Sequence, residues 1–497
     1  MVLFLLGRLR HNLALFLEDK IGAPYEQIII ITTMMSAIPF SLFNYYIKNR
    51  TMRLLYSLIV GLILHYSIYG IKSLHTIIST IVVYYFIKFF GRSLSPVYVL
   101  LGAFLQLSIL NIHRMIFDFG GWAIDDVSTI YMVHVAKYSA FAFSYADGAK
   151  KIETIRSKNH KRTRIENLPS ILEFSSYIFF YPTTLIGPFI EYIDYINFID
   201  FKDCYTDLDK KKSYILIEAC KRLALGIFWI VIFSLFENKF PMGAVGTPEF
   251  REKYPKWWMR FGYMYICGPM GRSKYYVAWL LTYSSLIFSG MAYGEETKKD
   301  PNNEEKMIVV KNVDKGSYGS ILYNEFGLHP KEKMVQWNRS IHLWLKYNIY
   351  IRVLASEGIG HNNNVLAALA TYSLSAIWHG FYPSYYISFL VVFLFEQDAI
   401  FLEQIGFYDF VNKHKFMWPI CFLKTTFFYD IIGSIFFCLK VDSSIEIFKN
   451  YYGLPLTAII GFYIVTLIGR IVFKIGHKKK EKIEPKEIEK EKTKKVE

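Results

Sequence analysis

The chain has 497 residues, of which 53% are hydrophobic, 18% are aromatic and only 20% are charged. This composition is too poor in charge for an ordinary soluble enzyme and favours a membrane protein. The formal net charge is +15, and its basic residues are concentrated in residues 150–164 and in the C-terminal tail. Basic blocks beside apolar segments are typical of cytoplasmic loops near anionic lipid, so we do not expect binding to nucleic acid.

The N-terminal twenty residues contain a short apolar run that two arginines interrupt, and no small-residue cleavage site follows it. We therefore do not expect a removable signal peptide. Leu3, Leu6, Leu9 and Leu13 recur at helical spacing. This pattern predicts an interfacial amphipathic helix over residues 1–20.

Apolar residues further along gather in blocks of about 20, the length that a helix needs to cross the hydrocarbon layer. The candidate spans lie at residues 26–47, 53–71, 74–90, 95–117, 127–146, 170–190, 214–236, 275–293, 340–356, 364–380, 383–402, 416–438 and 455–474. Because several of them contain Lys, Arg, His or Pro, we expect about ten to twelve transmembrane or re-entrant helices. The predicted fold is an all-α polytopic membrane protein.

The chain shows no linker rich in glycine and serine and no repeat of fixed period. The simplest partition is one membrane domain over residues 1–476 and a charged cytoplasmic tail over residues 477–497. The longest polar interruption, residues 294–320, is predicted to be a loop between the two halves of the domain. The five cysteines are scattered without a CxxC pair, which indicates neither a disulfide framework nor a zinc site.

Charged side chains inside apolar blocks need partners, because each costs about 2.5 to 3.5 kcal/mol at the bilayer centre. We expect such residues to pair with one another or to reach an interface. The residues concerned are Asp118, Asp125, Asp126, Lys137, Asp147, Glu173, Glu191, Asp194, His342, Lys346 and Arg352.

His379 stands at the end of the apolar run NVLAALATYSLSAIWHG, with no carboxylate or second histidine within one helical turn. A metal ligand would need such neighbours. Two interpretations remain: a neutral imidazole bonded to a backbone carbonyl, or a general base that takes a proton from an alcohol. Gly380 and Pro383 predict that the helix ends just after His379, where the helix dipole favours a cation.

Asn338 precedes the next helical stretch and lies in the sequence Asn-Arg-Ser, which formally matches a glycosylation site. A bulky glycan is unfavourable here, beside Trp337 and an apolar helix. The amide could cap the following helix, or it could hydrogen-bond a reacting carbonyl or hydroxyl group. Both interpretations stay open on the residues alone.

Other catalytic signatures are missing from the sequence, including GxSxG, GxxxxGK[ST], HExxH and GxGxxG. Ser375 and Ser384 flank His379 but lie on no recognisable nucleophile turn. A covalent serine mechanism is therefore not favoured.

The strings WNRSIHLWLKYNIYIR and SAIWHGFYPSYYISF resemble the membrane-bound O-acyltransferase superfamily, and more narrowly its lysophospholipid acyltransferase branch. Three further segments are similar to that branch and occur in its order: GWAIDDVSTIYMVHVAKYSAFAFSYADG, FFYPTTLIGPFIEYIDYINF and YYVAWLLTYSSLIFSGMAYG. The resemblance covers residues 118–390. The sterol and diacylglycerol acyltransferase motif Phe-Tyr-x-Asp-Trp-Trp-Asn is not found in this sequence.

The resemblance implies that His379 and Asn338 are the catalytic pair. It implies transfer of a fatty acyl group from acyl-CoA to the free hydroxyl of a lysophospholipid, within a reaction chamber that the membrane helices enclose. Acyl-CoA would be a co-substrate, and we expect no metal, no other cofactor and no obligatory protein partner. One departure is Ser384, where the family usually has glycine after Pro383.

Two further groups of side chains are assigned to the substrates. The tryptophans expected to wall the chamber and exclude water are Trp337, Trp344 and Trp378. The basic residues expected to meet substrate phosphates are Arg339, Lys346 and Arg352. The alternatives are a member of the same superfamily that acylates a protein or a polysaccharide, and a non-enzymatic transporter, although a transporter often shows matching half-chains.

The last four residues, Lys494 to Glu497, resemble the dilysine retrieval signal of endoplasmic reticulum membrane proteins. Such a signal requires a cytoplasmic tail, which the basic residues of the tail also favour. The predicted location is the endoplasmic reticulum membrane, with several crossings and a cytoplasmic C-terminus.

Overall fold

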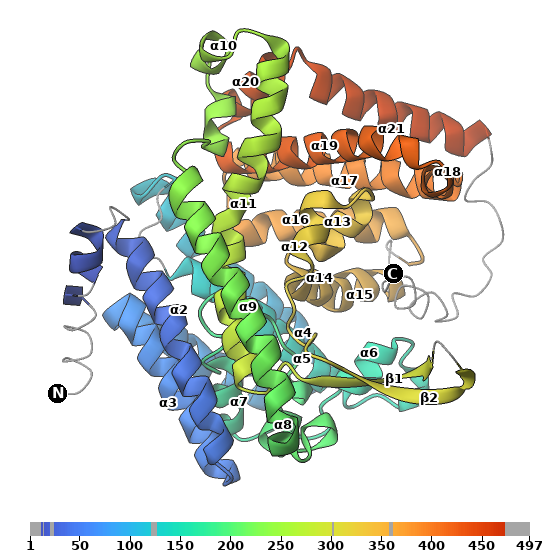
Figure 1. The fold of residues 1–497 in the computed structure, drawn as a ribbon. Coiled ribbons are helices and arrows are strands. Elements are labelled where there is room, and N and C mark those ends of the chain that lie inside the picture. Colours follow the sequence, from blue (N-terminus) through green and yellow to red (C-terminus); the bar gives the residue numbers. More distant parts are fainter. Residues whose placement is uncertain are drawn as a thin grey trace.

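A computed structural model describes residues 11–12, 14–19, 24–120, 127–300, 303–356 and 361–472. This part of the chain is almost entirely helical, as predicted (Figure 1). Within the predicted N-terminal amphipathic segment, residues 11–12 and 14–19 are helical. The tail at 477–497 and the aspartates Asp125 and Asp126 lie outside the described residues.

The N-terminal third consists of α2 (Tyr25–Phe43), α3 (Arg50–Tyr69), α4 (Leu74–Phe117) and α5 (Ser128–Asp147). The helix α4 bends sharply at Gly91, whose φ of 68° suits glycine and divides the helix into two arms. Against α4 packs α5, which is buried on nearly every face. A helix buried all round belongs to the core of the protein, so α5 is placed to position the helices around it.

Two long helices, α9 (Leu208–Phe236) and α11 (Trp257–Phe288), run side by side across the molecule (Figure 1). The C-terminal part contains α16 (Asn364–His379), α17 (Pro383–Gln404), α19 (Trp418–Cys438) and α21 (Leu454–Val472). In Figure 1 the last three form a stack at the upper right. The shorter helices are α6 (Lys158–Thr163), α7 (Ile171–Ile178), α8 (Tyr192–Ile199), α10 (Glu249–Lys253), α12 (Ile321–Phe326), α13 (Pro330–Gln336), α14 (Arg339–Leu345), α15 (Ile351–Ala355), α18 (Phe407–Lys413) and α20 (Val441–Asn450).

Four helical stretches of the described chain are long and apolar enough to cross a membrane: Tyr25–Tyr46, Arg50–Phe117, Pro383–Gln404 and Lys415–Cys438. The second of these is 68 residues long and contains α3 and both arms of α4. The multi-pass membrane fold is therefore confirmed. The expected number of ten to twelve spans stays a prediction.

Two local predictions are wrong. The segment 170–190 is not one span, because α7 ends at Ile178 and an irregular chain follows as far as α8. Prolines at 182 and 188 remove the donors that a continuous helix needs. The segment 294–320 is not only a loop, because β1 (Gly294–Asp300) and β2 (Asn303–Asn312) pair as an antiparallel hairpin. The β-branched run at 308–310 was the missed signal for a strand.

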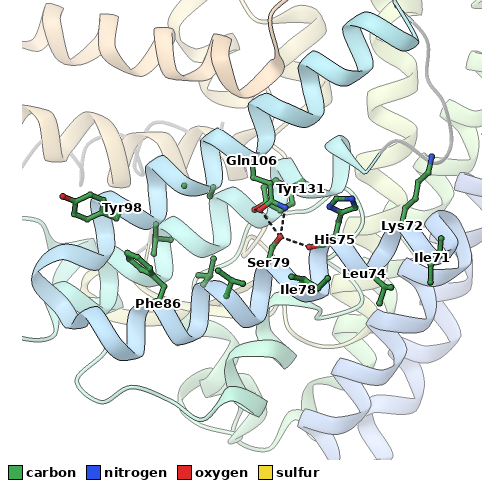
Figure 2. Close-up of a pocket in the computed structure, with 15 residues that line it drawn as sticks. Ile71, Lys72, Leu74, His75, Ile78, Ser79, Phe86, Tyr98, Gln106 and Tyr131 are labelled. Atoms are coloured by element: carbon green, nitrogen blue, oxygen red, sulfur yellow. Dashed lines mark hydrogen bonds between the residues drawn. The ribbon is translucent and has the colours of Figure 1, made fainter.

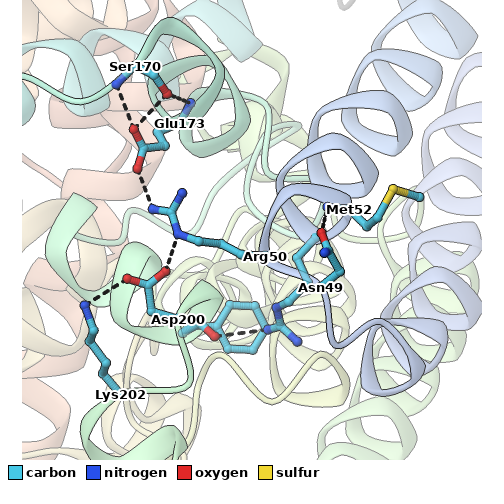
Figure 3. Close-up of polar contacts among 9 residues, drawn as sticks. Asn49, Arg50, Met52, Ser170, Glu173, Asp200 and Lys202 are labelled. Carbon is cyan, nitrogen blue, oxygen red and sulfur yellow. Dashed lines mark hydrogen bonds and ion pairs between the residues drawn. The ribbon is translucent and has the colours of Figure 1, made fainter.

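The expectation that charges inside apolar segments find partners is confirmed at Glu173. Arg50 Nη2 contacts Glu173 Oε1 at 2.5 Å and Arg50 Nε contacts Asp200 at 2.7 Å, while Lys202 holds the other oxygen of Asp200 (Figure 3). This network joins the start of α3 to α7 and α8. At the same end, Asn49 caps α3 by accepting from the backbone N–H of Met52.

Lys137 on α5 is also fully satisfied. Its ammonium group donates to the carbonyl oxygens of Tyr177 and Ile178 and to the hydroxyl of Thr183, at 2.8 to 3.0 Å. These three acceptors lie at the end of α7 and in the irregular chain that follows it. Lys137 therefore stabilises the backbone in the place where the predicted span is broken.

Candidate active site

His379 is the last residue of α16, as the positions of Gly380 and Pro383 predicted. Gly380 ends the helix with a φ of 127°, and α17 begins at Pro383. A φ of this size is strained for residues with a side chain. The turn therefore holds His379 at the C-terminus of α16, directly before the short connection to α17.

Aromatic rings surround the imidazole of His379. The ring centroids of Trp378, Tyr385, Phe389 and Phe436 lie at 4.9, 5.9, 5.3 and 5.0 Å from it. The residue is partly exposed, and within the described ranges no hydrogen bond reaches its ring nitrogens. The interpretation that a backbone carbonyl satisfies this histidine is therefore not realised in the structure.

Asn338 adopts a left-handed conformation, with φ 44° and ψ 54°, directly before α14. Its side chain makes no capping hydrogen bond. The backbone carbonyl instead accepts from the N–H groups of Ile341 and His342 at 3.0 Å. Within the described residues, the amide oxygen accepts only a long hydrogen bond of 3.4 Å from the Ser340 hydroxyl. The interpretation of Asn338 as a side-chain cap is therefore wrong, and most of its amide remains available for a ligand.

The helix that follows Asn338 (α14) and the helix that ends at His379 (α16) both contact α5. The indole N–H of Trp344 donates to the Ser139 hydroxyl at 3.1 Å, and the indole N–H of Trp378 donates to the Met132 carbonyl at 3.0 Å. The two indole rings lie 6.1 Å apart. Because Trp344 belongs to α14 and Trp378 directly precedes the end of α16, the buried helix α5 fixes both elements relative to each other.

Trp337, the residue before Asn338, packs against α11 and α19. Its ring lies 4.7 Å from Trp279, 5.4 Å from Tyr275 and 6.3 Å from Tyr276, all on α11. It also lies 6.4 Å from Tyr429 on α19. The Tyr-Tyr-x-x-Trp segment of the sequence is therefore the surface against which Trp337 packs.

A chain of aromatic contacts joins Trp337 to His379. Tyr275 lies 6.0 Å from Phe437, Phe437 lies 6.1 Å from Phe436, and Phe436 lies 5.0 Å from His379. Together with the contact between the two α5-anchored tryptophans, this chain connects the Asn338 turn with the His379 turn through apolar walls. Walls of this kind suit a reaction that must exclude water.

The basic residues assigned to substrate phosphates have different environments. Arg352 is engaged by Asp147, with an Nη2 to Oδ2 distance of 2.7 Å, so its charge is already compensated. Lys346 lies over the Tyr347 ring at 6.0 Å, within a π-helical turn that covers residues 346–350. Arg339 follows Asn338 and is partly exposed. A phosphate role for Arg339 and Lys346 stays a prediction.

A residue of the basic segment 150–164 forms a hydrogen bond with the π-helical turn. His160 forms a hydrogen bond of 2.8 Å through Nε2 with the Tyr347 carbonyl. Burial, together with the nearby positive charge of Arg352, lowers the pKa of His160 to about 4. The ring is therefore neutral at physiological pH and donates one N–H to this carbonyl.

Sequence reasoning missed two residues on α4. Asn111 packs against Gly380, and Arg114 lies with its guanidinium centre 5.9 Å from the Tyr382 ring. Both residues therefore face the turn that follows His379. Both residues lie in the predicted span 95–117, but nothing in the sequence distinguishes them from the other polar residues of that span.

A groove of about 720 Å³ runs between the two arms of α4 (Figure 2). Its lining is mostly apolar, but Tyr131 of α5 donates to Gln106 at 2.6 Å, and Gln106 donates to Ser79 at 2.7 Å, at its floor. Neither Asn338 nor His379 lines this groove. Tyr131, which lines the groove, directly precedes Met132, whose carbonyl anchors Trp378.

Comparisons with known proteins cover most of the chain. Residues 73–441 match the model of the membrane-bound O-acyltransferase family. A lysophospholipid acyltransferase of Schizosaccharomyces pombe is 27% identical over 350 residues, which are 66% of this chain and 64% of that protein. Lysophospholipid acyltransferase 6 of Drosophila melanogaster is 26% identical over 469 residues, which are 88% of this chain and 60% of that protein.

Lysophospholipid acyltransferase 5 of Homo sapiens is 23% identical over 447 residues, which are 88% of this chain and 87% of that protein. The chain thus spans less than two thirds of the length of the yeast and fly relatives, but most of the human one. The family match includes both the Asn338 turn and the His379 turn.

Proposed function

The chain belongs to the membrane-bound O-acyltransferase family, and on this premise we propose that it transfers a fatty acyl group from acyl-CoA to the free hydroxyl of a lysophospholipid. The names of its relatives support this choice of acceptor. The single observation that carries the proposal is the state of His379. It is a partly exposed imidazole without a hydrogen-bond partner in the described chain, and aromatic walls connect it to Asn338, whose side chain does not cap α14.

In the proposed reaction, His379 takes the proton from the acceptor hydroxyl while that oxygen attacks the thioester carbonyl of acyl-CoA. Asn338 donates its amide N–H to the oxyanion that develops on the carbonyl oxygen. The carbon–sulfur bond then breaks, the new ester bond remains, and the leaving thiolate of CoA receives the proton from the imidazolium. No metal takes part in these steps.

The two substrates reach the site by different routes in this proposal. CoA is soluble and polyanionic, so it enters from the cytosolic face, where the basic segment 150–164 lies. The lysophospholipid diffuses in from the bilayer, and the apolar groove between the arms of α4 receives its acyl chain. A volume of about 720 Å³ is in the usual range for ligand pockets. The proposed location is the endoplasmic reticulum membrane.

The proposal is tested with the purified full chain, which is expected to act without a protein partner. His379→Ala is expected to reduce acyl transfer by about 100- to 10,000-fold, the range typical for loss of a general base. Formation of acylated phospholipid from lysophospholipid and acyl-CoA is the measurement. His414→Ala is the matched control, because His414 is exposed and lies between α18 and the start of α19. Near-normal turnover in the His379→Ala protein would overturn both the mechanism and the site.

A further inference from the structure

Asn111 is a buried amide that forms no side-chain hydrogen bond with the described residues. Its side chain is only 1% exposed, and neither Oδ1 nor Nδ2 forms a hydrogen bond with the part of the chain that the structure describes. Burial of an amide without hydrogen bonds is unfavourable in an apolar medium, and the bilayer interior supplies no compensating water. A side chain of this kind therefore indicates a polar ligand that binds beside it.

The position of Asn111 gives the place where that ligand would bind. A Cβ atom added to Gly380 would lie 3.4 Å from Asn111 Cγ and 3.6 Å from Asn111 Nδ2. The amide thus packs directly against the residue that follows His379. Glycine at 380 serves two purposes, since it adopts the positive φ of 127° and leaves room for this amide.

The surroundings of Asn111 combine positive charge with access to lipid. Arg114, one helical turn further along the same side of α4, is close enough to His379 and Tyr385 for its charge to act on both. The opposite side of α4 exposes large apolar side chains that suit contact with lipid, namely Leu105, Ile109, Ile112 and Ile116. The helix is therefore a wall between the bilayer and His379.

We propose that Asn111 hydrogen-bonds the glycerol and phosphate oxygens of the lysophospholipid acceptor and so positions its free hydroxyl at His379. This inference rests on the proposed function. Nδ2 donates to a phosphate or ester oxygen, Oδ1 accepts from a hydroxyl, and Arg114 adds charge that attracts the phosphate. The acceptor is the better match than acyl-CoA, because Asn111 lies beside His379 on a helix whose opposite side exposes apolar side chains, and the lysophospholipid enters from the bilayer in the proposed function.

The test compares wild-type protein with Asn111→Leu and Asn111→Asp in lipid nanodiscs. Both variants have nearly the shape of asparagine and lack the N–H donors, and the aspartate adds a charge that repels phosphate. The second-order rate constant kcat/KM for lysophosphatidylcholine and lysophosphatidylinositol is expected to fall by about 10- to 100-fold, the effect of losing a hydrogen bond to a charged group. The KM for oleoyl-CoA is expected to change less than twofold.

Thermal unfolding separates this role from a structural one. Asn111→Leu is expected to keep or raise the melting temperature, because it removes an unsatisfied buried amide. Ser95→Ala is the matched control, since Ser95 is also buried on α4 with an unpartnered hydroxyl, but lies 16 residues before Asn111. Its kinetics are expected to match those of wild type.

Three outcomes would overturn the inference. These are normal lysophospholipid kinetics in both Asn111 variants, a lower melting temperature with unchanged kinetics, and an equal loss toward both substrates. A wild-type protein that acylates no lysophospholipid would instead overturn the proposed function itself. The failure of the Asn111 role is thus distinguishable from the failure of the reaction.

Discussion

Asn338 is held in a left-handed backbone conformation, which asparagine tolerates better than most residues with a Cβ atom. Since its side chain does not cap α14, the role of its amide is open to a direct test. Asn338→Asp retains the shape and the backbone preference but loses the N–H donors. We expect its turnover to fall by about 100- to 1000-fold, with a smaller change in KM, because an oxyanion contact tightens in the transition state.

The measurement is kcat and KM for both substrates together with the melting temperature. Asn338→Gly is the companion variant, since glycine accepts the left-handed conformation and removes the whole side chain. If Asn338→Asp retained wild-type turnover while Asn338→Gly lost it, the N–H donor would not be the catalytic group.

Ser384, one departure from the family pattern, forms two hydrogen bonds in the structure. Its hydroxyl donates to the Lys440 carbonyl at 2.9 Å and contacts the Ser444 hydroxyl at 2.8 Å, so it ties the start of α17 to the chain around α20. The glycine that the family usually has at this position would lose both contacts. Ser384 is therefore a structural connection in this chain.

At the scale of elements, a buried cluster of charged side chains joins α11, α12, α13 and α19. Arg272 of α11 contacts both oxygens of Glu325, at 2.9 and 2.5 Å, and also contacts Asp430 of α19. Lys333 of α13 donates to the Glu325 carbonyl at 3.3 Å. Two positive and two negative side chains thus balance one another, which is the arrangement that burial of charge requires.

We expect Arg272→Met to lower the free energy of unfolding by about 3 to 5 kcal/mol, because it leaves two buried carboxylates without their main partner. The measurement is thermal or denaturant unfolding of the purified protein in detergent. Lys48→Met is the control, since the Lys48–Asp209 pair is more than half exposed and is expected to contribute less than about 1 kcal/mol. An equal effect of the two substitutions would contradict a structural role for the cluster.

The groove in α4 yields a second prediction for an element. Gly102 lines the groove, and a Cβ atom there would meet no other atom within 4 Å, so we expect the side chain of Gly102→Phe to occupy part of the groove. If the groove receives the acyl chain of the acceptor, the KM for a long-chain lysophospholipid should rise about tenfold, the effect of losing a few methylene contacts. The KM for a short-chain lysophospholipid should change little.

The matched control for the groove is Gly262→Phe on α11, because that glycine is also exposed and has open space beside it. Equal effects on long and short acceptors, or an equal effect of the control, would remove the groove from the acceptor's route.

At the scale of the whole molecule, local signals predicted most helices and one of the two site turns. The positions of Gly380 and Pro383 predicted the end of α16 correctly, because each residue ends a helix through its own backbone conformation. The contacts of Trp344 and Trp378 with α5 could not be predicted, since they join residues more than 200 positions apart. Asn111 was missed for the same reason, because its importance depends on a neighbour 269 positions away, Gly380.

The orientation of the chain in the membrane is the last prediction. The segment 150–164 and the tail at 477–497 both carry excess basic residues, and such segments stay on the cytoplasmic side. An even number of complete crossings must therefore separate them. Lys161→Cys and Thr493→Cys, introduced separately into a Cys220→Ser background, place one thiol in each segment. The background removes the exposed native thiol.

In sealed microsomes whose outer face is cytoplasmic, both introduced thiols should react with a membrane-impermeant maleimide before detergent is added. Reaction of only one of them would place the two segments on opposite sides and contradict the proposed entry of CoA beside the basic segment. Protection of both until detergent is added would put both in the lumen and rule out a dilysine signal, which works only in the cytosol.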